Sequence, residues 1–279
     1  MSTFLVLLRE GAEAALIVAI VLAYLCSLNR PDAARLVWAG VGAAVVVSAG
    51  AGATLHATLG SLEGRSEEIV EGALAVAAVA VLTWMVFWMA ARASALRSRL
   101  EGEVAAALSG GGLALAAVGF VAVLREGLET ALFLIAAGGA GWAARVAWGA
   151  GGLAAAAALG VLAYQGGRRL DLGLFFRVTG GLLILFAAGL LAGAVHEFQE
   201  AGVLPAGVDP LWSLRFGDPA SGAGWRAAAE VFGWTPAPSL LQVVAYWAYL
   251  LPVGVVFVRR SRRKTASASE DPRVAAPVR

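Results

Sequence analysis

Seven long apolar segments constrain the fold of this chain more than any other feature. A hydrocarbon core about 30 Å thick takes about 20 residues of helix to cross, and each segment is long enough. Sixty per cent of the 279 residues are apolar and the mean hydropathy is +0.79, which excludes an ordinary soluble domain. We therefore expect an all-α polytopic membrane protein with seven transmembrane helices, because helices satisfy their own backbone groups in lipid. The segments run approximately over residues 4–28, 36–57, 69–91, 113–138, 144–164, 174–195 and 240–258.

Positive charge separates sharply between alternate connections of these segments. The connections after the first, third and fifth segments, and the tail beyond the seventh, are rich in arginine. By the positive-inside rule, the N-terminus is expected outside and the C-terminus in the cytoplasm. The basic residues on the expected inner side are Arg30, Arg35, Arg92, Arg97, Arg99, Arg168, Arg169, Arg177 and the run RRSRRK from Arg259, whereas the other connections hold only Arg65, Arg145, Arg215 and Arg226.

The chain is expected to form one membrane domain over residues 1–258. The tail, residues 259–279, is basic and then low in complexity, so we expect it to be disordered and held near anionic lipid.

A charged motif recurs inside two of the apolar segments. It reads LREGAEAALIVAI from Leu8 and LREGLETALFLIA from Leu124, at the heads of the first and fourth segments. Three spans separate the copies, so their two helices run in opposite directions. This pattern predicts an inverted repeat of three plus three helices, with halves of about residues 1–91 and 113–195 and the seventh helix outside the repeat. Such folds place their sites near the midplane, where we expect the two copies to meet.

Each copy of the motif places three charges on one helix face, because positions i, i+3 and i+4 lie within about 100° of one another. Each such charge costs roughly 2.5 to 3.5 kcal/mol near the centre of a membrane helix, whereas each large apolar residue returns only about 0.3 to 0.6 kcal/mol. The charges should therefore face the bundle interior or a wet cavity. They are Arg9, Glu10 and Glu13 in the first copy and Arg125, Glu126 and Glu129 in the second.

Pairing of these charges within each helix is incomplete. Each arginine can reach the glutamate four positions on, which leaves Glu10 and Glu126 without a cation on their own helix. Two positive and four negative charges give a formal charge of minus two, and oxygen ligands suit hard cations such as Fe³⁺, Mg²⁺, Mn²⁺ or Ca²⁺. We expect the four glutamates to bind a metal ion and the two arginines to moderate their field. The alternative is that the charges are structural ion pairs, but such pairs stabilise no better than apolar packing, and their duplication favours function.

Two further clusters are expected at the outer surface, where the third segment begins and the sixth ends. We expect them to form an acidic funnel that captures metal ions. The alternative is that they are solvated helix ends, and for the first cluster also a favourable interaction with a helix N-terminus. The clusters comprise Glu67, Glu68 and Glu71, and His196, Glu197 and Glu200. The aromatic-rich connection over residues 196–239 should form short amphipathic pieces in the outer interface.

Paired REGxE motifs in a seven-helix chain resemble those of the oxidase-dependent iron permeases, the family of the fungal high-affinity iron permeases and their bacterial EfeU-type relatives. The likeness extends to EEIVEG and LTWMVFWM in the third segment, HEFQEAGVLP after the sixth and GWTPAPSLLQ before the seventh. The resemblance implies uptake of iron, as Fe³⁺, Fe²⁺ or both, across the cytoplasmic membrane. It also implies that the four motif glutamates are ligands and that ExxE pairs such as Glu68 with Glu71 assist them.

We therefore expect a transporter and not an enzyme, with iron as its substrate and without a permanently bound cofactor. No oxidase, cupredoxin or haem domain is fused to the seven segments, so a separate extracytoplasmic oxidase, peroxidase or iron-delivery protein is the expected partner. Membrane lipid is the other partner, and no nucleic-acid role is expected. The first motif has Ala12 where the second has Leu128, a difference that should not touch the ligands. Two alternatives stay open: a transporter of another divalent metal such as manganese or lead, or a non-transporting membrane metal sensor or scaffold.

Overall fold

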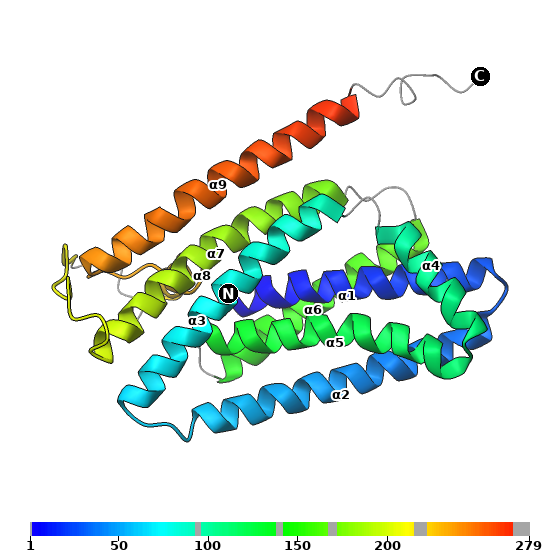
Figure 1. Ribbon diagram of the computed structural model, residues 1–279, viewed down its shortest axis with the longest axis horizontal. Helices are drawn as coiled ribbons and strands as arrows, with labels where there is room; N and C mark the ends of the chain where they lie inside the picture. Colours follow the sequence, from blue (N-terminus) through cyan, green and yellow to red (C-terminus); the bar gives the residue numbers. More distant parts are fainter. Residues whose placement is uncertain (1, 93–95, 138–141, 167–171, 215–221, 270–279) are drawn as a thin grey trace.

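The computed structural model describes residues 2–92, 96–137, 142–166, 172–214 and 222–269, and its long elements are α-helices (Figure 1). Each of the seven predicted segments forms one of these helices. They are α1 (Ser2–Ser27), α2 (Ala34–Leu59), α3 (Arg65–Arg92), α5 (Gly112–Ala136), α6 (Trp142–Gly166), α7 (Leu172–Glu200) and α9 (Leu240–Ser269). Apart from an isolated antiparallel bridge between Pro210 and Ser239, the described residues form no β-structure. The predicted all-α class is confirmed.

In the described part of the chain, four helices are long and apolar enough to cross a membrane. They lie within Pro31–Leu59, Arg65–Met89, Leu174–Glu200 and Leu240–Ser261. The helix α6 contributes a shorter apolar run, Val146–Leu162. Helices of this length and composition are stable in lipid and not in water, so the chain is a helical membrane protein.

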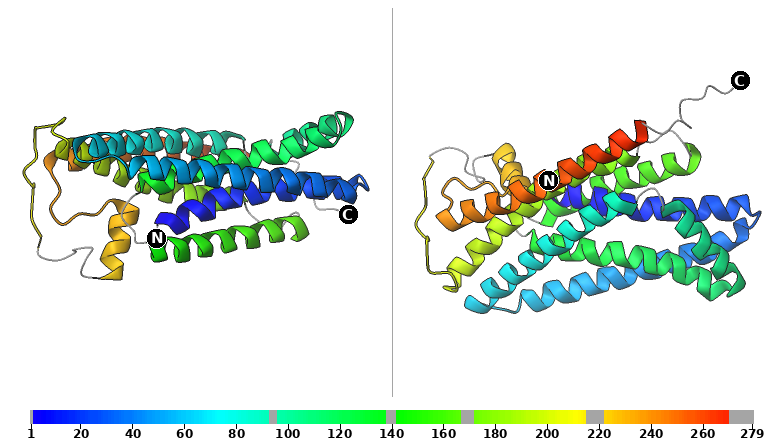
Figure 2. Two further views of the ribbon diagram at one scale, coloured as in Figure 1. Left: turned by 90° about the horizontal axis from the view of Figure 1, so that it is seen from below. Right: turned by 45° about the horizontal axis from the view of Figure 1, so that its top comes forward.

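The long helices pack in pairs that are distant in sequence. The helix α1 lies along α6, α2 along α5 and α3 along α7, while α9 lies against α7 (Figures 1 and 2). The helices α1 and α5 also touch, and they run in opposite directions (Figure 1). If α1, α2 and α3 are taken as equivalent to α5, α6 and α7, the α1–α6 pair is equivalent to the α2–α5 pair, and the α3–α7 pair is equivalent to itself. The packing of these six helices is therefore symmetric.

One helix occupies a stretch that was expected to be only a connection. The helix α4 (Leu96–Ser109) has too few apolar residues for a membrane span, but Leu100, Val104 and Ala107 recur at helical spacing and are buried. The helix packs on α5 and α1 at the end of the bundle. A search for long apolar runs misses such a helix, because only one face of it is apolar.

The remaining differences concern the ends of the bundle. The helix α9 continues past Val258 to Ser269, so it includes the first part of the expected tail. Residues 270–279 lie outside the described residues, as do Arg168, Arg169 and Arg215, three of the arginines whose distribution predicts the orientation. Two short elements complete the chain, a 3-10 turn at Pro31–Ala33 and the helix α8 (Ala223–Phe232).

Candidate metal site

The two charged motifs meet where α1 and α5 lie side by side. The motif lies near the start of α1 but past the midpoint of α5, so the expectation that it heads both helices is wrong for the second copy. Because the two helices are antiparallel, the early part of α1 lies level with the late part of α5. One carboxylate oxygen each from Glu10, Glu13 and Glu126 lies within 4.8 Å of the others. Oxygens on opposite sides of one hard cation are about 4 to 5 Å apart, so these three are close to the spacing of a shared ion.

The fourth motif glutamate lies at the edge of this group. Glu129 is not one of the three clustered carboxylates, and its Oε1 accepts a hydrogen bond from Arg125 Nε at 2.9 Å. Its negative charge still acts on Glu10 and Glu13 across the helix pair. The structure thus brings three of the four predicted ligands together and leaves the fourth with its arginine.

Arg9 is the more enclosed of the two cations, with 2% of its side chain exposed. Its Nη1 lies 3.3 Å from Glu10 Oε1 and its Nη2 lies 3.1 Å from Glu13 Oε1. Nη1 also donates to the sulfur of Met85 on α3, at 3.1 Å. The predicted pair with Glu13 is therefore confirmed, but the prediction that Glu10 has no cation on its own helix is wrong. The forked guanidinium reaches both carboxylates at once, which spacing along the helix did not indicate.

Arg125 is held in a different way. It is 34% exposed, and only its Nε faces the carboxylates, at 2.9 Å from Glu129 Oε1 and 3.8 Å from Glu126 Oε1. Its Cζ lies 4.9 Å from the ring centroid of Trp88 and 5.7 Å from that of Trp84, both on α3. Its Nη2 is buried and finds no hydrogen-bond partner among the described residues. The two arginines of the repeat are thus not equivalent.

Each of the four glutamates has one buried oxygen that accepts no hydrogen bond from any described residue. Glu13 Oε1 is within ion-pair distance of Arg9, but its geometry does not form a hydrogen bond. An unsatisfied buried polar atom costs about 1 to 3 kcal/mol, and more when charged, so four of them together need a partner. The oxygens are Glu10 Oε2, Glu13 Oε1, Glu126 Oε2 and Glu129 Oε2.

The glycine of each motif allows another helix to approach the charged residues. A Cβ built on Gly11 would lie 2.9 Å from the Cβ of Ala156 on α6. A Cβ on Gly127 would overlap the Cβ and hydroxyl oxygen of Ser48 on α2, which is buried. These two glycines therefore admit a neighbouring helix beside the charged residues. The helices α6 and α2 fill equivalent positions against α1 and α5, and they close two sides of the site.

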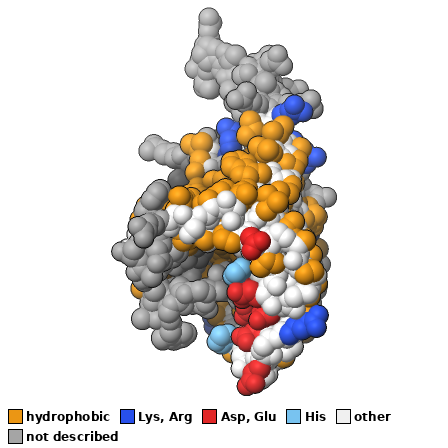
Figure 3. Space-filling view, turned by 90° about the vertical axis from the view of Figure 1, so that its left-hand side faces the viewer, with side chains coloured by type: hydrophobic (Ala, Val, Ile, Leu, Met, Phe, Trp, Pro, Cys, Tyr) orange, Lys and Arg blue, Asp and Glu red, His pale blue; other side chains and the backbone are white. Residues whose placement is uncertain are grey.

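The two outer clusters lie close together because α3 packs along α7. A Cβ on Gly72 of α3 would meet the ring of Phe198 on α7 at 2.9 Å, so the two helices are in close contact beside the clusters. The charges of Glu68 and Glu71 act on Glu197, and His196 Nε2 lies 3.3 Å from Glu200 Oε1. Figure 3 shows acidic side chains along one strip of this face, with histidine beside them. Glu67 is half-buried near the start of α3.

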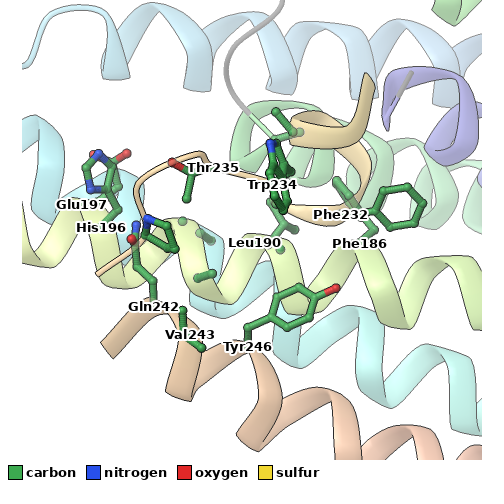
Figure 4. Close-up of a pocket in the computed structure, with 18 of the residues that line it drawn as sticks. Phe186, Leu190, His196, Glu197, Phe232, Trp234, Thr235, Gln242, Val243 and Tyr246 are labelled. Atoms are coloured by element: carbon green, nitrogen blue, oxygen red, sulfur yellow. The ribbon is translucent and has the colours of Figure 1, made fainter. Parts of the chain in front are cut away.

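A cavity of about 730 Å³ opens beside these clusters, between α3, α7, α8 and α9. Figure 4 shows His196 and Glu197 at one end of the cavity and Phe186 and Phe232 at the other. Glu71 also lines it, and most of the other lining residues are apolar or aromatic. The charged residues of the cavity lie at the end with the acidic clusters, and most of the remaining wall is apolar or aromatic.

An apolar layer separates the cavity from the motif carboxylates. Phe186 and Leu190 line the cavity and belong to a buried cluster that also contains Val6, Leu82 and Phe133. Val6 lies one turn before Glu10 on α1, and Phe133 lies one turn after Glu129 on α5, each with none of its surface exposed. This apolar layer thus lies between the cavity and the clustered carboxylates.

The three residues of α3 that contact the arginines were not predicted from the sequence. Trp84, Met85 and Trp88 belong to the sequence LTWMVFWM, which indicated only a family likeness. A usable signal was present, because tryptophans four residues apart share one helix face. What the sequence lacked was the position of α3 beside both motifs.

Comparison with known proteins identifies relatives that match nearly the whole chain. Residues 1–261 match the model of the family described as Iron permease FTR1 family. The chain is 39% identical over 271 residues to the ferrous iron permease EfeU of Escherichia coli O6:H1, which covers 95% of this chain and 98% of that protein. It is 37% identical over 273 residues to the ferrous iron permease EfeU of Yersinia pestis, with 95% of each chain covered. No solved structure matches the chain.

Proposed function

This chain belongs to the iron permease FTR1 family and imports iron as a permease, not as an enzyme, and we propose that iron passes between α1 and α5 through the site formed by Glu10, Glu13, Glu126 and Glu129. One observation carries this assignment of the site. Each of the four glutamates, of which Glu10, Glu13 and Glu126 are buried residues, has a buried oxygen that no described residue hydrogen-bonds. A cation is the partner that would satisfy the oxygens of the clustered Glu10, Glu13 and Glu126, and none of them needs to lose another hydrogen bond to bind it.

The cargo that we propose is Fe²⁺. The relatives from Escherichia coli and Yersinia pestis carry the description ferrous iron permease. The formal charge of the site, four glutamates against two arginines, is minus two, and one divalent cation neutralises it. A trivalent ion would leave an excess positive charge in a buried place, which costs free energy in a low dielectric. Metal sensing without transport is not favoured, because the matching relatives are permeases.

We propose that the chain lies in the cytoplasmic membrane with seven spans, the N-terminus outside and the C-terminus inside. The asymmetry of arginine between alternate connections supports this orientation. The equivalence of the α1–α6 and α2–α5 pairs supports a repeat of three plus three inverted helices, with α9 outside it.

The exposed Cys26, near the inner end of α1, can report the orientation of the chain. A membrane-impermeant maleimide should label it only in permeabilised cells.

A direct test is uptake of radiolabelled Fe²⁺ into proteoliposomes that contain only this chain, under anaerobic reducing conditions. We expect accumulation above that of protein-free liposomes, with excess Mn²⁺ and Pb²⁺ competing weakly. Stronger competition by Mn²⁺ or Pb²⁺ would change the proposed cargo. Folded protein without any flux would contradict the proposal that the chain transports by itself. Uptake that begins only when an extracytoplasmic oxidase or delivery protein is added would make that partner a required component.

We propose that the outer clusters raise the local concentration of iron before it enters the site. Replacing Glu68 and Glu71 together with Gln should raise the half-saturating iron concentration several-fold and change the maximal rate little, because these residues attract the ion and do not carry it through the membrane. The measurement is initial uptake rate against iron concentration at low and high ionic strength. The effect should shrink at high salt, where surface charge is screened. An unchanged half-saturating concentration at low salt would remove this role.

A further inference from the structure

The helix α3 contacts the arginines of both motifs, although it carries no part of either motif. Met85 accepts a hydrogen bond from Arg9, and the indoles of Trp84 and Trp88 face the guanidinium of Arg125. The two indoles lie 6.0 Å apart with their planes 34° from each other, so they form one aromatic surface along α3. The aromatic surface contacts only the second of the two arginines.

The two arginines consequently direct different atoms at the carboxylates. Arg9 places both terminal nitrogens, Nη1 and Nη2, within 3.3 Å of carboxylate oxygens. Arg125 offers only Nε, the nitrogen nearest the backbone, and its Nη2 has no hydrogen-bond partner among the described residues. The terminal end of Arg125 faces the indoles and not Glu126.

This arrangement decides how much of the second motif is open to a cation. A guanidinium that turned its terminal nitrogens toward Glu126 would form a bidentate pair and cover the open oxygen Oε2. The face of an indole is a favourable alternative for the same charge, and more so when water is excluded. The aromatic surface therefore competes with Glu126 for the positive end of Arg125.

We propose that Trp84 and Trp88 are positioning residues that hold the guanidinium of Arg125 away from Glu126 and so keep this carboxylate available to iron. The inference rests on the proposed function of the glutamates as iron ligands. Trp84 and Trp88 touch the arginine and not the ion, so they set the affinity of the site through Arg125. Among the described residues no aromatic surface faces Arg9, which stays on its carboxylates.

The test is equilibrium binding of radiolabelled Fe²⁺ to the purified full chain in lipid nanodiscs. Replacing both tryptophans with leucine should weaken Fe²⁺ binding about tenfold, since two partly exposed cation–π contacts are together worth about that factor. The Trp84→Phe, Trp88→Phe variant keeps aromatic faces and should lose much less. Trp38→Leu is the matched control, because Trp38 is an exposed tryptophan of α2, and it should bind as the wild type does.

A double-mutant cycle separates a role through Arg125 from a general effect on packing. In an Arg125→Gln background the leucine variant should change Fe²⁺ affinity by less than about twofold, because the competing cation is gone. A tenfold loss that persists in this background, or no loss in the background with Arg125, would overturn the inference. Trp88→Leu alone carries the same test if the double variant does not fold, since Trp88 is the nearer indole.

The experiment also distinguishes failure of this inference from failure of the proposed function. Glu126→Gln should abolish Fe²⁺ binding in the same nanodiscs. If Glu126→Gln binds normally, the glutamates are not the ligands and the proposed function fails. If Glu126→Gln loses binding while the leucine variant binds as the wild type does, only the role of the aromatic surface is wrong.

Discussion

Replacement of Glu10 or Glu126 with Gln is expected to abolish uptake of radiolabelled iron while the protein stays in the membrane at its normal abundance. Both side chains are buried, and both belong to the three carboxylates whose oxygens lie within 4.8 Å of one another. Glutamine has the same size and shape but no charge, so it removes a ligand that a dehydrated cation needs. It also removes a buried negative charge, which should not harm folding.

The matched control for these variants is Glu103→Gln. Glu103 is an exposed glutamate of α4 that accepts a hydrogen bond from Arg99. It differs from the motif glutamates both in its exposure and in its partner. Its replacement should leave both uptake and abundance unchanged. The measurement is initial uptake normalised to membrane protein. Normal uptake in both Glu10→Gln and Glu126→Gln would contradict a central site built from the two motifs.

Sequence was sufficient for the parts of this molecule that depend on local spacing. The seven apolar segments became seven helices because a run of about 20 apolar residues has few other stable structures in lipid. The pairs of Arg9 with Glu13 and Arg125 with Glu129 follow from helical periodicity, which brings positions i and i+4 to one face. These features need no knowledge of which helices are neighbours.

The features that sequence did not predict all depend on contacts between helices. The level at which the motifs meet is set by the packing of α1 on α5, and it places the second motif past the midpoint of its helix. The different environments of Arg9 and Arg125 come from α3, which is adjacent to both motifs only in the folded bundle. A repeat in sequence thus does not guarantee two equivalent halves of a site.

The cavity and the apolar layer below it have the same origin. The hydrogen bond from Ser239 Oγ to Gln199 Oε1, at 2.8 Å, joins the start of α9 to the end of α7. Gly233 ends α8 with φ 65° and lies against Gly189 of α7, where any side chain would collide. These contacts fold the outer connection over the bundle and create an apolar-walled space that the aromatic composition alone did not indicate. An apolar layer lies between this space and the carboxylates.

The second large effect is expected from Arg9. Replacing Arg9 with Met should leave Glu10 and Glu13 buried without a cation, at a cost of about 3 to 5 kcal/mol. Met has a similar length and keeps the apolar contacts of the side chain, so the loss of charge is isolated. The same replacement of Arg125, which is 34% exposed and contacts its carboxylates only through Nε, should cost much less. We therefore expect Arg9→Met to lower the amount of folded protein and its thermal stability in detergent, and Arg125→Met to leave both near the wild type.

A triple variant shows whether the loss comes from the unpaired carboxylates. Adding Glu10→Gln and Glu13→Gln to Arg9→Met removes the buried charges that Arg9 had neutralised, so stability should return while uptake stays absent. Recovery of folded protein without transport would mean that Arg9 stabilises the site when no metal is bound. The glutamates would then be the residues that transport requires. If Arg9→Met folds as well as Arg125→Met, the burial of Arg9 between Glu10 and Glu13 does not stabilise this end of the bundle. The two arginines would then be equivalent, as the repeat in the sequence indicates.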